Sequence, residues 1–116
     1  MRRGDVILVD LTPVRGSEAA KRRPVIVVSN DDANRGAAAR GRGVITVVPI
    51  TSNTARVYPF QVRLPPGPGT GLATESKGQA EQVRSIDVSR VTKRLGALSE
   101  PQLREIDEAL RLHLAL

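Results

Sequence analysis

The chain has 116 residues, and 18 Lys and Arg against 12 Asp and Glu give it a formal net charge of +6. This basic surplus predicts a polyanionic partner, with nucleic acid ahead of an anionic membrane surface, although Arg-rich composition can also reflect a GC-rich genome. The absence of Cys excludes disulfides and thiolate zinc sites. With 40% hydrophobic residues but only one Tyr and one Phe, residues 1–116 are expected to form one domain with an aliphatic core.

The N-terminus does not have the pattern of a signal peptide. Arg2 and Arg3 are followed by Asp5, and no long apolar run comes after them. No stretch of the chain approaches the length of a transmembrane helix. We therefore expect a cytoplasmic protein.

Three apolar runs predict the strands of the N-terminal half. Residues 6–9 are typical of a short core strand, and the β-branched run at 25–28 predicts a strand buried on both faces. Pro24, which has no N–H, suits the first position of that strand. Residues 44–51 predict a third strand, in which Pro49 requires an edge position or a bulge. The segments between these strands are expected to be loops at 12–23 and 33–43, with a turn or a short helix cap at 29–32.

The C-terminal half predicts further short strands and one helix. A strand with one solvent-exposed face is expected at 58–64, followed by a rigid surface turn at 65–71. Two further strands are expected at 72–74 and 80–86, around a polar turn at 76–78, and a last strand at 91–98. Ser99 and Gln102 form a capping box at the start of the helix. Its apolar stripe contains Leu103, Ile106, Leu110 and Leu114. Together these elements predict a mainly β fold, a small β-barrel with a C-terminal helix packed on it.

The residue types exclude several kinds of catalysis. His113 is the only histidine, so neither a histidine-pair ribonuclease nor a Ser-His-Asp triad at a strand end is expected, and its position favours a surface residue near the helix C-terminus. Asp31 and Asp32 are adjacent and are expected to point apart, which favours a turn over a metal site. No Gly-rich nucleotide-binding loop follows a strand. We therefore expect no metal and no cofactor.

The remaining Arg, Thr, Glu and Gln residues are sufficient to cleave RNA. RNA supplies its own nucleophile, the 2′-hydroxyl, which attacks the neighbouring phosphorus once a carboxylate accepts its proton. A guanidinium and a hydroxyl can stabilise the charge that develops on the phosphate. Residues of the right types are Glu18, Arg23, Thr51 and Glu81. Composition alone does not bring these four together, and each taken singly is more typical of a solvated or capping polar residue.

Motifs along almost the whole chain resemble the MazF/PemK family of toxin endoribonucleases. In chain order they are RGDV at 3–6, GSE at 16–18, RPVIVVSND at 23–31, VPIT at 48–51, YPF at 58–60 and EQVRSID at 81–87, followed by the Leu-rich helix. The resemblance implies an SH3-like barrel that works as a homodimer. It also implies a type II toxin–antitoxin system, in which the toxin cuts single-stranded mRNA at a short motif and so inhibits translation and growth. The implied cleavage needs no metal and leaves a 2′,3′-cyclic phosphate and a 5′-hydroxyl. The implied antitoxin has a disordered acidic tail, which suits the positive charge of this chain.

The resemblance also assigns the candidate site. The arginine of Arg-Pro and the threonine that ends the third strand, here Arg23 and Thr51, are the main catalytic pair, with Glu18 as a further candidate. Some members use an arginine and an aspartate two residues apart, and here Gln79 and Glu81 stand at those positions. The missing arginine weakens the case for Glu81 as the base and shifts weight to Arg23, Thr51 and Glu18. The residues expected to bind RNA are Ser17, Lys21, Arg22, Asn30, Asn34, Ser52, Asn53, Gln79 and Gln82.

Three alternatives stay open at this point. A related class of toxin shares the barrel but poisons gyrase, and it would not need the Arg23–Thr51 pair. A non-catalytic basic barrel would bind RNA in a salt-sensitive way without cutting it. A degenerate member of the family would act only as a decoy for the antitoxin.

Overall fold

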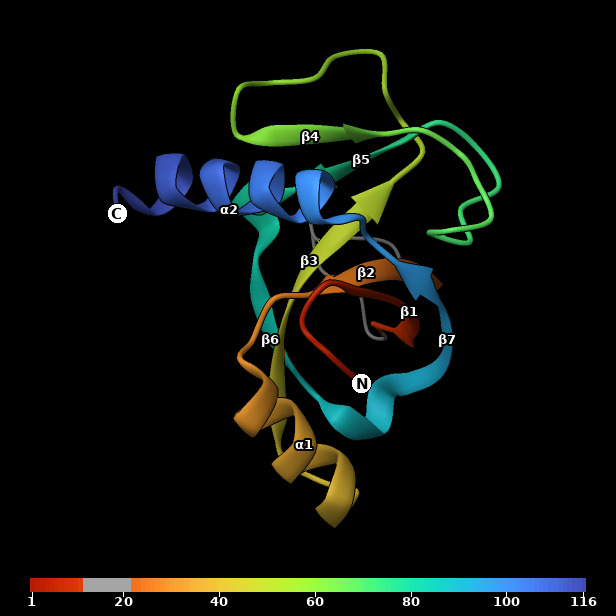
Figure 1. Ribbon diagram of the computed structural model, residues 1–116, viewed down its shortest axis with the longest axis vertical. Helices are drawn as coiled ribbons and strands as arrows, with labels where there is room; N and C mark the ends of the chain where they lie inside the picture. Colours follow the sequence, from red (N-terminus) through yellow and green to blue (C-terminus); the bar gives the residue numbers. More distant parts are fainter. Residues whose placement is uncertain (12–21) are drawn as a thin grey trace.

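A computed structural model describes residues 1–11 and 22–116 of the chain (Figure 1). Its strands are β1 (Asp5–Asp10), β2 (Arg22–Val27), β3 (Val44–Thr51), β4 (Gln61–Leu64), β5 (Ser76–Gln79), β6 (Arg84–Asp87) and β7 (Val91–Ala97). Its helices are α1 (Asp31–Arg40) and α2 (Glu100–Leu114), with 3₁₀ turns η1 (Ala80–Gln82) and η2 (Val88–Arg90). Neither α1 nor α2 is long and apolar enough to cross a membrane.

The strands form one antiparallel sheet in the order β4-β5-β3-β2-β1-β7, and β6 also pairs with β3. Strand β3 pairs with β2 along one edge, and along its other edge it pairs first with β6 and then with β5. The strand order does not close on itself, so the sheet is barrel-like without a continuous ring of hydrogen bonds. The predicted fold class, mainly β with a helix at the C-terminus, is confirmed.

The core consists of aliphatic residues on both faces of the sheet. One cluster includes Val6, Ile26, Val48 and Ile50 and is covered by Ile106 of α2. The other includes Ile7, Val25 and Val47 and is covered by Ala37 of α1; the full lists contain only Ala, Val, Leu and Ile among the buried hydrophobic residues described. As predicted, β2 is buried on both faces, because Val25, Ile26 and Val27 are each 0% exposed.

Helix α2 begins as the sequence predicts. The Ser99 side chain accepts a hydrogen bond from the Gln102 N–H, and the Gln102 side chain accepts one from the Ser99 N–H. The apolar stripe reaches the core through Ile106 and Leu110, but Leu114 is 48% exposed. The stripe therefore extends beyond the part of the sheet that it covers.

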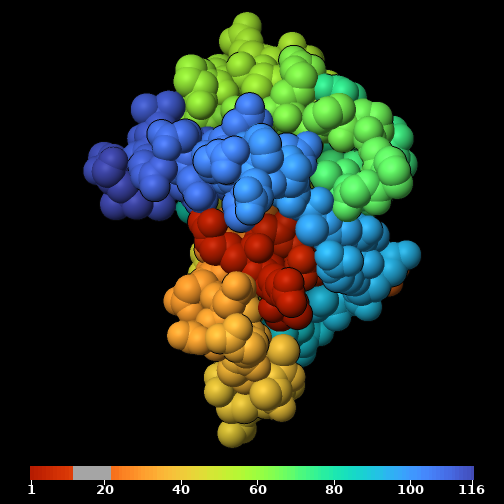
Figure 2. All heavy atoms as spheres, viewed as in Figure 1, coloured from red at the N-terminus to blue at the C-terminus, as the bar shows by residue number. Residues whose placement is uncertain are grey.

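Residues 33–43 were expected to be a loop, but most of them belong to helix α1. The Asn30 side chain caps its start by accepting a hydrogen bond from the Ala33 N–H, and Gly41 ends it in the left-handed conformation with a φ of 67°. Alanines between the two caps favour a helix strongly enough to outweigh the Gly and Arg that suggested a loop. Figure 2 shows α1 as a lobe at one end of the molecule.

Asp31 and Asp32 both lie in the first turn of α1 and have different partners. The Asp31 Oδ1 accepts a hydrogen bond of 2.7 Å from the Arg3 N–H, which lowers the pKa of this carboxyl. Asp32 forms an ion pair of 2.5 Å with Arg35. The two carboxylates point apart as expected, and both suit the positive end of the helix dipole.

The region of residues 58–86 is the second place where the structure differs from the prediction. Residues 76–78 were expected to be a polar turn, but they form β5, in which Ser76 and Lys77 are buried. Residues 80–86 contain η1 and β6 instead of one strand. Residues 72–74 contribute only a single bridge, from Leu72 to Gly67. The strand expected at 58–64 begins at Gln61, as β4. Lys77 is tolerated in the sheet because its ammonium donates to the Arg56 carbonyl, 2.5 Å away.

Pro49 lies in β3 where one edge of the strand has no partner. Pro49 pairs with Val25 of β2, and on the opposite edge of β3 neither Val48 nor Pro49 has a partner, because β6 pairing stops at Val47 and β5 pairing starts at Ile50. The predicted edge strand or bulge is therefore replaced by a gap between two partner strands. Pro24 is the third residue of β2 and not its first.

Strand β7 packs very closely against the turn at residues 67–72. The Ala97 N–H donates to the Gly69 carbonyl at 3.0 Å. A Cβ added at Gly96 would lie 2.2 Å from the Gly69 carbonyl oxygen, and one added at Gly71 would lie 2.3 Å from the Leu95 carbonyl oxygen. Both glycines are therefore required for backbone to pack directly against backbone.

We predict that Gly96→Ala lowers the free energy of unfolding by about 1–3 kcal/mol, because the new methyl group must push the 67–72 turn away from β7. Gly67→Ala is the matched control, since an added Cβ there meets nothing within 4 Å and its effect should stay within about 1 kcal/mol. Urea unfolding of both variants measures the difference. Equal stability of the two variants would contradict the close packing described here.

Candidate active site

A cleft of about 360 Å³ lies where the start of β2 meets the end of β3. The 71–74 segment and Leu95 of β7 complete its walls. Its described lining residues include the cations Arg22 and Arg23, the hydroxyl residues Thr51, Ser52, Thr74 and Ser76, and the apolar residues Pro24, Ile50, Leu72 and Leu95. No carboxylate is among them. Such a lining suits an anion whose oxygens accept hydrogen bonds.

Arg23 lines this cleft and is held by a hydrogen bond to the sheet. Its Nη1 donates to the Ile50 carbonyl at 3.0 Å, and its Nε is buried without an acceptor among residues 1–11 and 22–116. Burial removes water from the guanidinium and so lowers its pKa from the ordinary value. An arginine stays protonated at neutral pH even so. The site thus holds a partly dehydrated cation with hydrogen-bonding capacity to spare.

Thr51 is the last residue of β3, and it lines the same cleft. The Thr51 Oγ1 accepts a hydrogen bond of 3.2 Å from the Asn53 N–H, and the Asn53 side chain accepts one of 3.3 Å from the Ala55 N–H. These two local turns direct the chain out of the sheet directly after Thr51. Ser52 lines the cleft, whereas Asn53 is exposed beside it.

The structure brings together four of the residues that the sequence predicted, namely Arg22, Arg23, Thr51 and Ser52. Ser17, Lys21 and Glu18 lie outside the described residues. Gln79, Glu81 and Gln82 are half-buried at the end of β5 and in η1, and none of them lines the cleft. The predicted residues therefore fall into separate groups.

Gln61 contacts the group of residues at the end of β5 and in η1, and the sequence analysis did not predict it. It is 8% exposed; its Nε2 donates to the Glu81 Oε2 at 2.8 Å, and its Oε1 accepts from the Tyr58 N–H at 3.1 Å. Its position in the alternating 58–64 segment suggested only a solvent-facing polar residue. The feature that marks Gln61 is the burial of its polar side chain inside a strand. Burial cannot be read from the local sequence.

Asn30 and Asn34 lie beyond the other end of β2, where α1 begins. Asn34 is 0% exposed, its Oδ1 accepts from the Ser29 hydroxyl at 2.5 Å, and its Nδ2 donates to the Ser29 carbonyl at 2.9 Å. The Asn30 side chain is used as the helix cap. Both side chains make hydrogen bonds that support the fold, far along β2 from Arg23.

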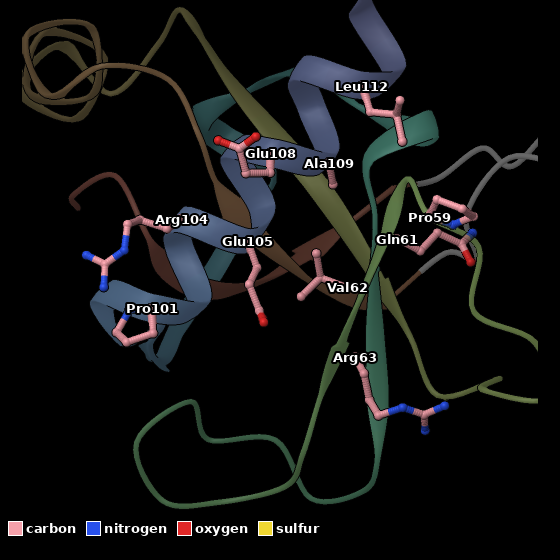
Figure 3. Close-up of a pocket in the computed structure, with 10 residues that line it drawn as sticks. All are labelled: Pro59, Gln61, Val62, Arg63, Pro101, Arg104, Glu105, Glu108, Ala109 and Leu112. Atoms are coloured by element: carbon pink, nitrogen blue, oxygen red, sulfur yellow. The ribbon is translucent and has the colours of Figure 1, made fainter.

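A larger groove, of about 750 Å³, lies between α2 and β4 (Figure 3). Val62 of β4 and Ala109 of α2 contribute to its lining. Its charged lining residues are Arg63, Arg104, Glu105 and Glu108, whose charges cancel. A neutral lining of this kind does not suit a phosphate backbone. The smaller cleft is therefore the better candidate for an active site.

Within the described part of the chain, no three His, Cys, Asp or Glu residues gather where they could hold a metal ion. His113 is exposed near the end of α2, with its ring 6.4 Å from that of Phe60.

Comparison with known proteins assigns the chain to a family. Residues 2–114 match the family described as PemK-like, MazF-like toxin of type II toxin–antitoxin system. The chain belongs to this toxin family. It is 57% identical to endoribonuclease MazF9 of Mycobacterium tuberculosis, with all of the chain and 98% of the relative covered.

Solved structures of PemK/MazF-like proteins have the same fold. MazF from Deinococcus radiodurans superposes with a TM-score of 0.80 at 29% identity, over 100% of this chain and 97% of that one. A MazE–MazF structure from the same organism gives a TM-score of 0.73 at 25% identity, over 100% and 96%. The PemK/MazF-like resemblance inferred from the sequence motifs is thus confirmed.

We predict that Asn34→Ala destabilises the fold by about 1–3 kcal/mol, because it removes a buried side chain that satisfies both the hydroxyl and the carbonyl of Ser29. Asn53→Ala is the matched control, and as an exposed turn residue it should change stability by less than about 1 kcal/mol. Thermal unfolding of the two variants distinguishes them. If Asn34→Ala were as stable as the parent chain, the role of Asn34 in holding α1 would be wrong.

Proposed function

We propose that the chain is the toxin of a type II toxin–antitoxin system and acts as an endoribonuclease on single-stranded mRNA. It cuts at a short sequence motif without a metal, leaves a 2′,3′-cyclic phosphate and a 5′-hydroxyl, and so inhibits translation and growth. Membership of the PemK/MazF-like family and identity to a relative named as an endoribonuclease support this proposal. The observation that carries it is that Arg23 and Thr51, from two different strands, line one cleft without an acidic neighbour among the described lining residues.

Arg23 stabilises the phosphate in this mechanism. Attack by the 2′-hydroxyl on phosphorus increases the negative charge on the non-bridging oxygens, and a guanidinium fixed beside them stabilises the transition state more than the substrate. The hydrogen bond to the Ile50 carbonyl holds Arg23 in place before RNA arrives. A phosphate oxygen also supplies an acceptor that the buried Arg23 Nε lacks among the described residues.

Thr51 supplies a further hydrogen bond to the phosphate, and a carboxylate accepts the proton of the 2′-hydroxyl. The Thr51 hydroxyl donates to the phosphate, because the Asn53 N–H already occupies one of its acceptor positions. Glu81 does not line the cleft, so we assign the acceptance of the 2′-hydroxyl proton to Glu18, five positions before Arg23 in the sequence. Arg23 or a water bound beside it then protonates the leaving 5′-oxygen.

The proposed partners follow from the same family. The chain forms a homodimer, and its activity is blocked by a cognate antitoxin with a disordered acidic tail. A MazE–MazF structure at 25% identity supports a protein partner of this kind. The net charge of +6 favours both an acidic tail and RNA. We place the protein in the cytoplasm, where its mRNA substrate lies.

We predict that the chain cuts mixed-sequence single-stranded RNA in EDTA at one short motif, and that Arg23→Ala reduces the rate by about 10²–10³-fold. Arg35→Ala is the matched control, since it removes the same charge from the exposed face of α1 and should cut normally. Mapping and chemical analysis of the product ends measure both variants. Circular dichroism shows that each variant is folded.

Two results would contradict this proposal. RNA that is bound tightly and released by salt, but never cut, would support the non-catalytic binding module instead. Equal cutting rates for Arg23→Ala and the parent chain would remove Arg23 from the mechanism.

We predict that Thr51→Val lowers the cleavage rate by about tenfold or more while Thr51→Ser keeps most of it, because only the hydroxyl is required at this position. Valine preserves the shape of threonine and fits the end of a β-strand, so the fold should be unaffected. Single-turnover rates on the mapped motif measure the effect. Retained cleavage in Thr51→Val together with a loss in Thr51→Ser would show that the methyl group, and not the hydroxyl, matters.

A further inference from the structure

Residues 52–60 leave the sheet after Thr51 and return to it at Gln61, the first residue of β4 (Figure 1). They belong to no strand or helix, most of them are exposed, and none is buried. The segment therefore has neither ladder hydrogen bonds nor a buried apolar face to hold it in one position. It nevertheless begins at the cleft, which Thr51 and Ser52 both line.

The ammonium of Lys77 holds the middle of this segment. Its Nζ donates to the Arg56 carbonyl at 2.5 Å and lies 6.0 Å from the centroid of the Tyr58 ring. The Arg56 Nη1 in turn donates to the Tyr58 hydroxyl at 3.3 Å. One side chain of β5 thus contacts two residues of a segment that the sheet itself does not hold.

Lys77 also stands directly opposite Thr51. The two residues are partners in the register of β3 and β5, and the side chains of antiparallel partners lie on the same face of a sheet. Lys77 is 8% exposed, and it is not among the described residues that line the cleft. We therefore expect it to affect the cleft through the residues that it holds.

Stability does not explain a lysine at this position. On the other edge of β5 its partner is Arg63, and like charges opposite each other destabilise a sheet. Among residues 1–11 and 22–116, no carboxylate forms an ion pair with Lys77. Burial of a charge without such a partner costs free energy, and a β-branched residue would suit the strand better. A residue that is unfavourable for its own strand is expected where function requires it.

We propose that Lys77 is a positioning residue for RNA cleavage, which holds the segment after Thr51 and so aligns Thr51 and Ser52 with the phosphate. The inference rests on the proposed function, because it assumes that the cleft binds the reacting phosphate. The link runs from Lys77 to the Arg56 carbonyl, and from there along the chain to Asn53, whose N–H donates to the Thr51 Oγ1. A displaced segment should slow the chemical step more than it weakens RNA binding, because it changes alignment and not contact.

Lys77→Met tests this role, because methionine is long and unbranched but carries no ammonium. On the mapped RNA motif we expect kcat to fall about tenfold, KM to change less than about twofold and the urea unfolding midpoint to stay the same. Lys77→Arg, which can still donate to the Arg56 carbonyl, should restore most of kcat. Lys93→Met is the matched control, since it removes an exposed lysine from β7 and should change neither constant.

A double-mutant cycle shows whether Lys77 acts through Thr51. In a Thr51→Val chain the hydroxyl is already absent, so the further change Lys77→Met should lower the rate less than about twofold. The salt dependence of kcat/KM should be the same in Lys77→Met as in the parent chain. A smaller salt dependence together with a raised KM would show that Lys77 contacts a phosphate directly, and would overturn the positioning role.

Amide hydrogen exchange tests the same contact without RNA. In Lys77→Met the Asn53 and Ala55 N–H groups, which are bonded within the segment, should exchange about tenfold faster. The N–H of Val47, which lies between β2 and β6 in the middle of β3, should exchange as slowly as in the parent chain.

Three further results would overturn the inference. They are an unchanged kcat in Lys77→Met, unchanged exchange at Asn53 and Ala55, and fully additive losses from Lys77→Met and Thr51→Val. A parent chain that never cuts RNA, combined with faster exchange at Asn53 and Ala55 in Lys77→Met, would instead overturn the proposed function and leave Lys77 as the residue that holds the segment.

Discussion

The antiparallel pairing of β2 with β3 is the constraint on which the candidate site depends. Val25 stands opposite Pro49 in this register, and the start of β2 therefore lies beside the end of β3. The Arg23 guanidinium can reach the Ile50 carbonyl only because of this register. A slip of one residue would turn every side chain of β2 to the other face and break both core clusters, so the core that stabilises the fold also fixes the cation in the cleft.

Some of this arrangement could be predicted from the sequence. The aliphatic strands 6–9, 24–28 and 44–51 and the capping box of α2 are local signals, and each produced an element close to its predicted position. Arg23 and Thr51 could be named from motifs, and the sheet brings them together. Helix α1 carried readable signals in Asn30 and Gly41, but the Arg and Gly residues beside them pointed to a loop.

Other features depend on contacts between distant residues, which no local pattern encodes. Residues 76–78 look like a turn, and they become a strand because Gly78 lets Ile106 and Ile26 pack against its backbone. Gln61 and Glu81 meet only when β4 lies beside β5. Asn34 resembles a residue that binds RNA, and only its full burial shows that its hydrogen bonds belong to the fold.

The gap beside Pro49 has a mechanical consequence. Strands β4 and β5 join the remaining strands only through the last residues of β3, so the sheet consists of two parts that share one strand. The cleft lies across this junction, with Arg23 on one part and Ser76 on the other. The width of the cleft therefore depends on the course of β3 at Pro49, where the pairing with Val25 of β2 is the only ladder contact of this residue among the described strands.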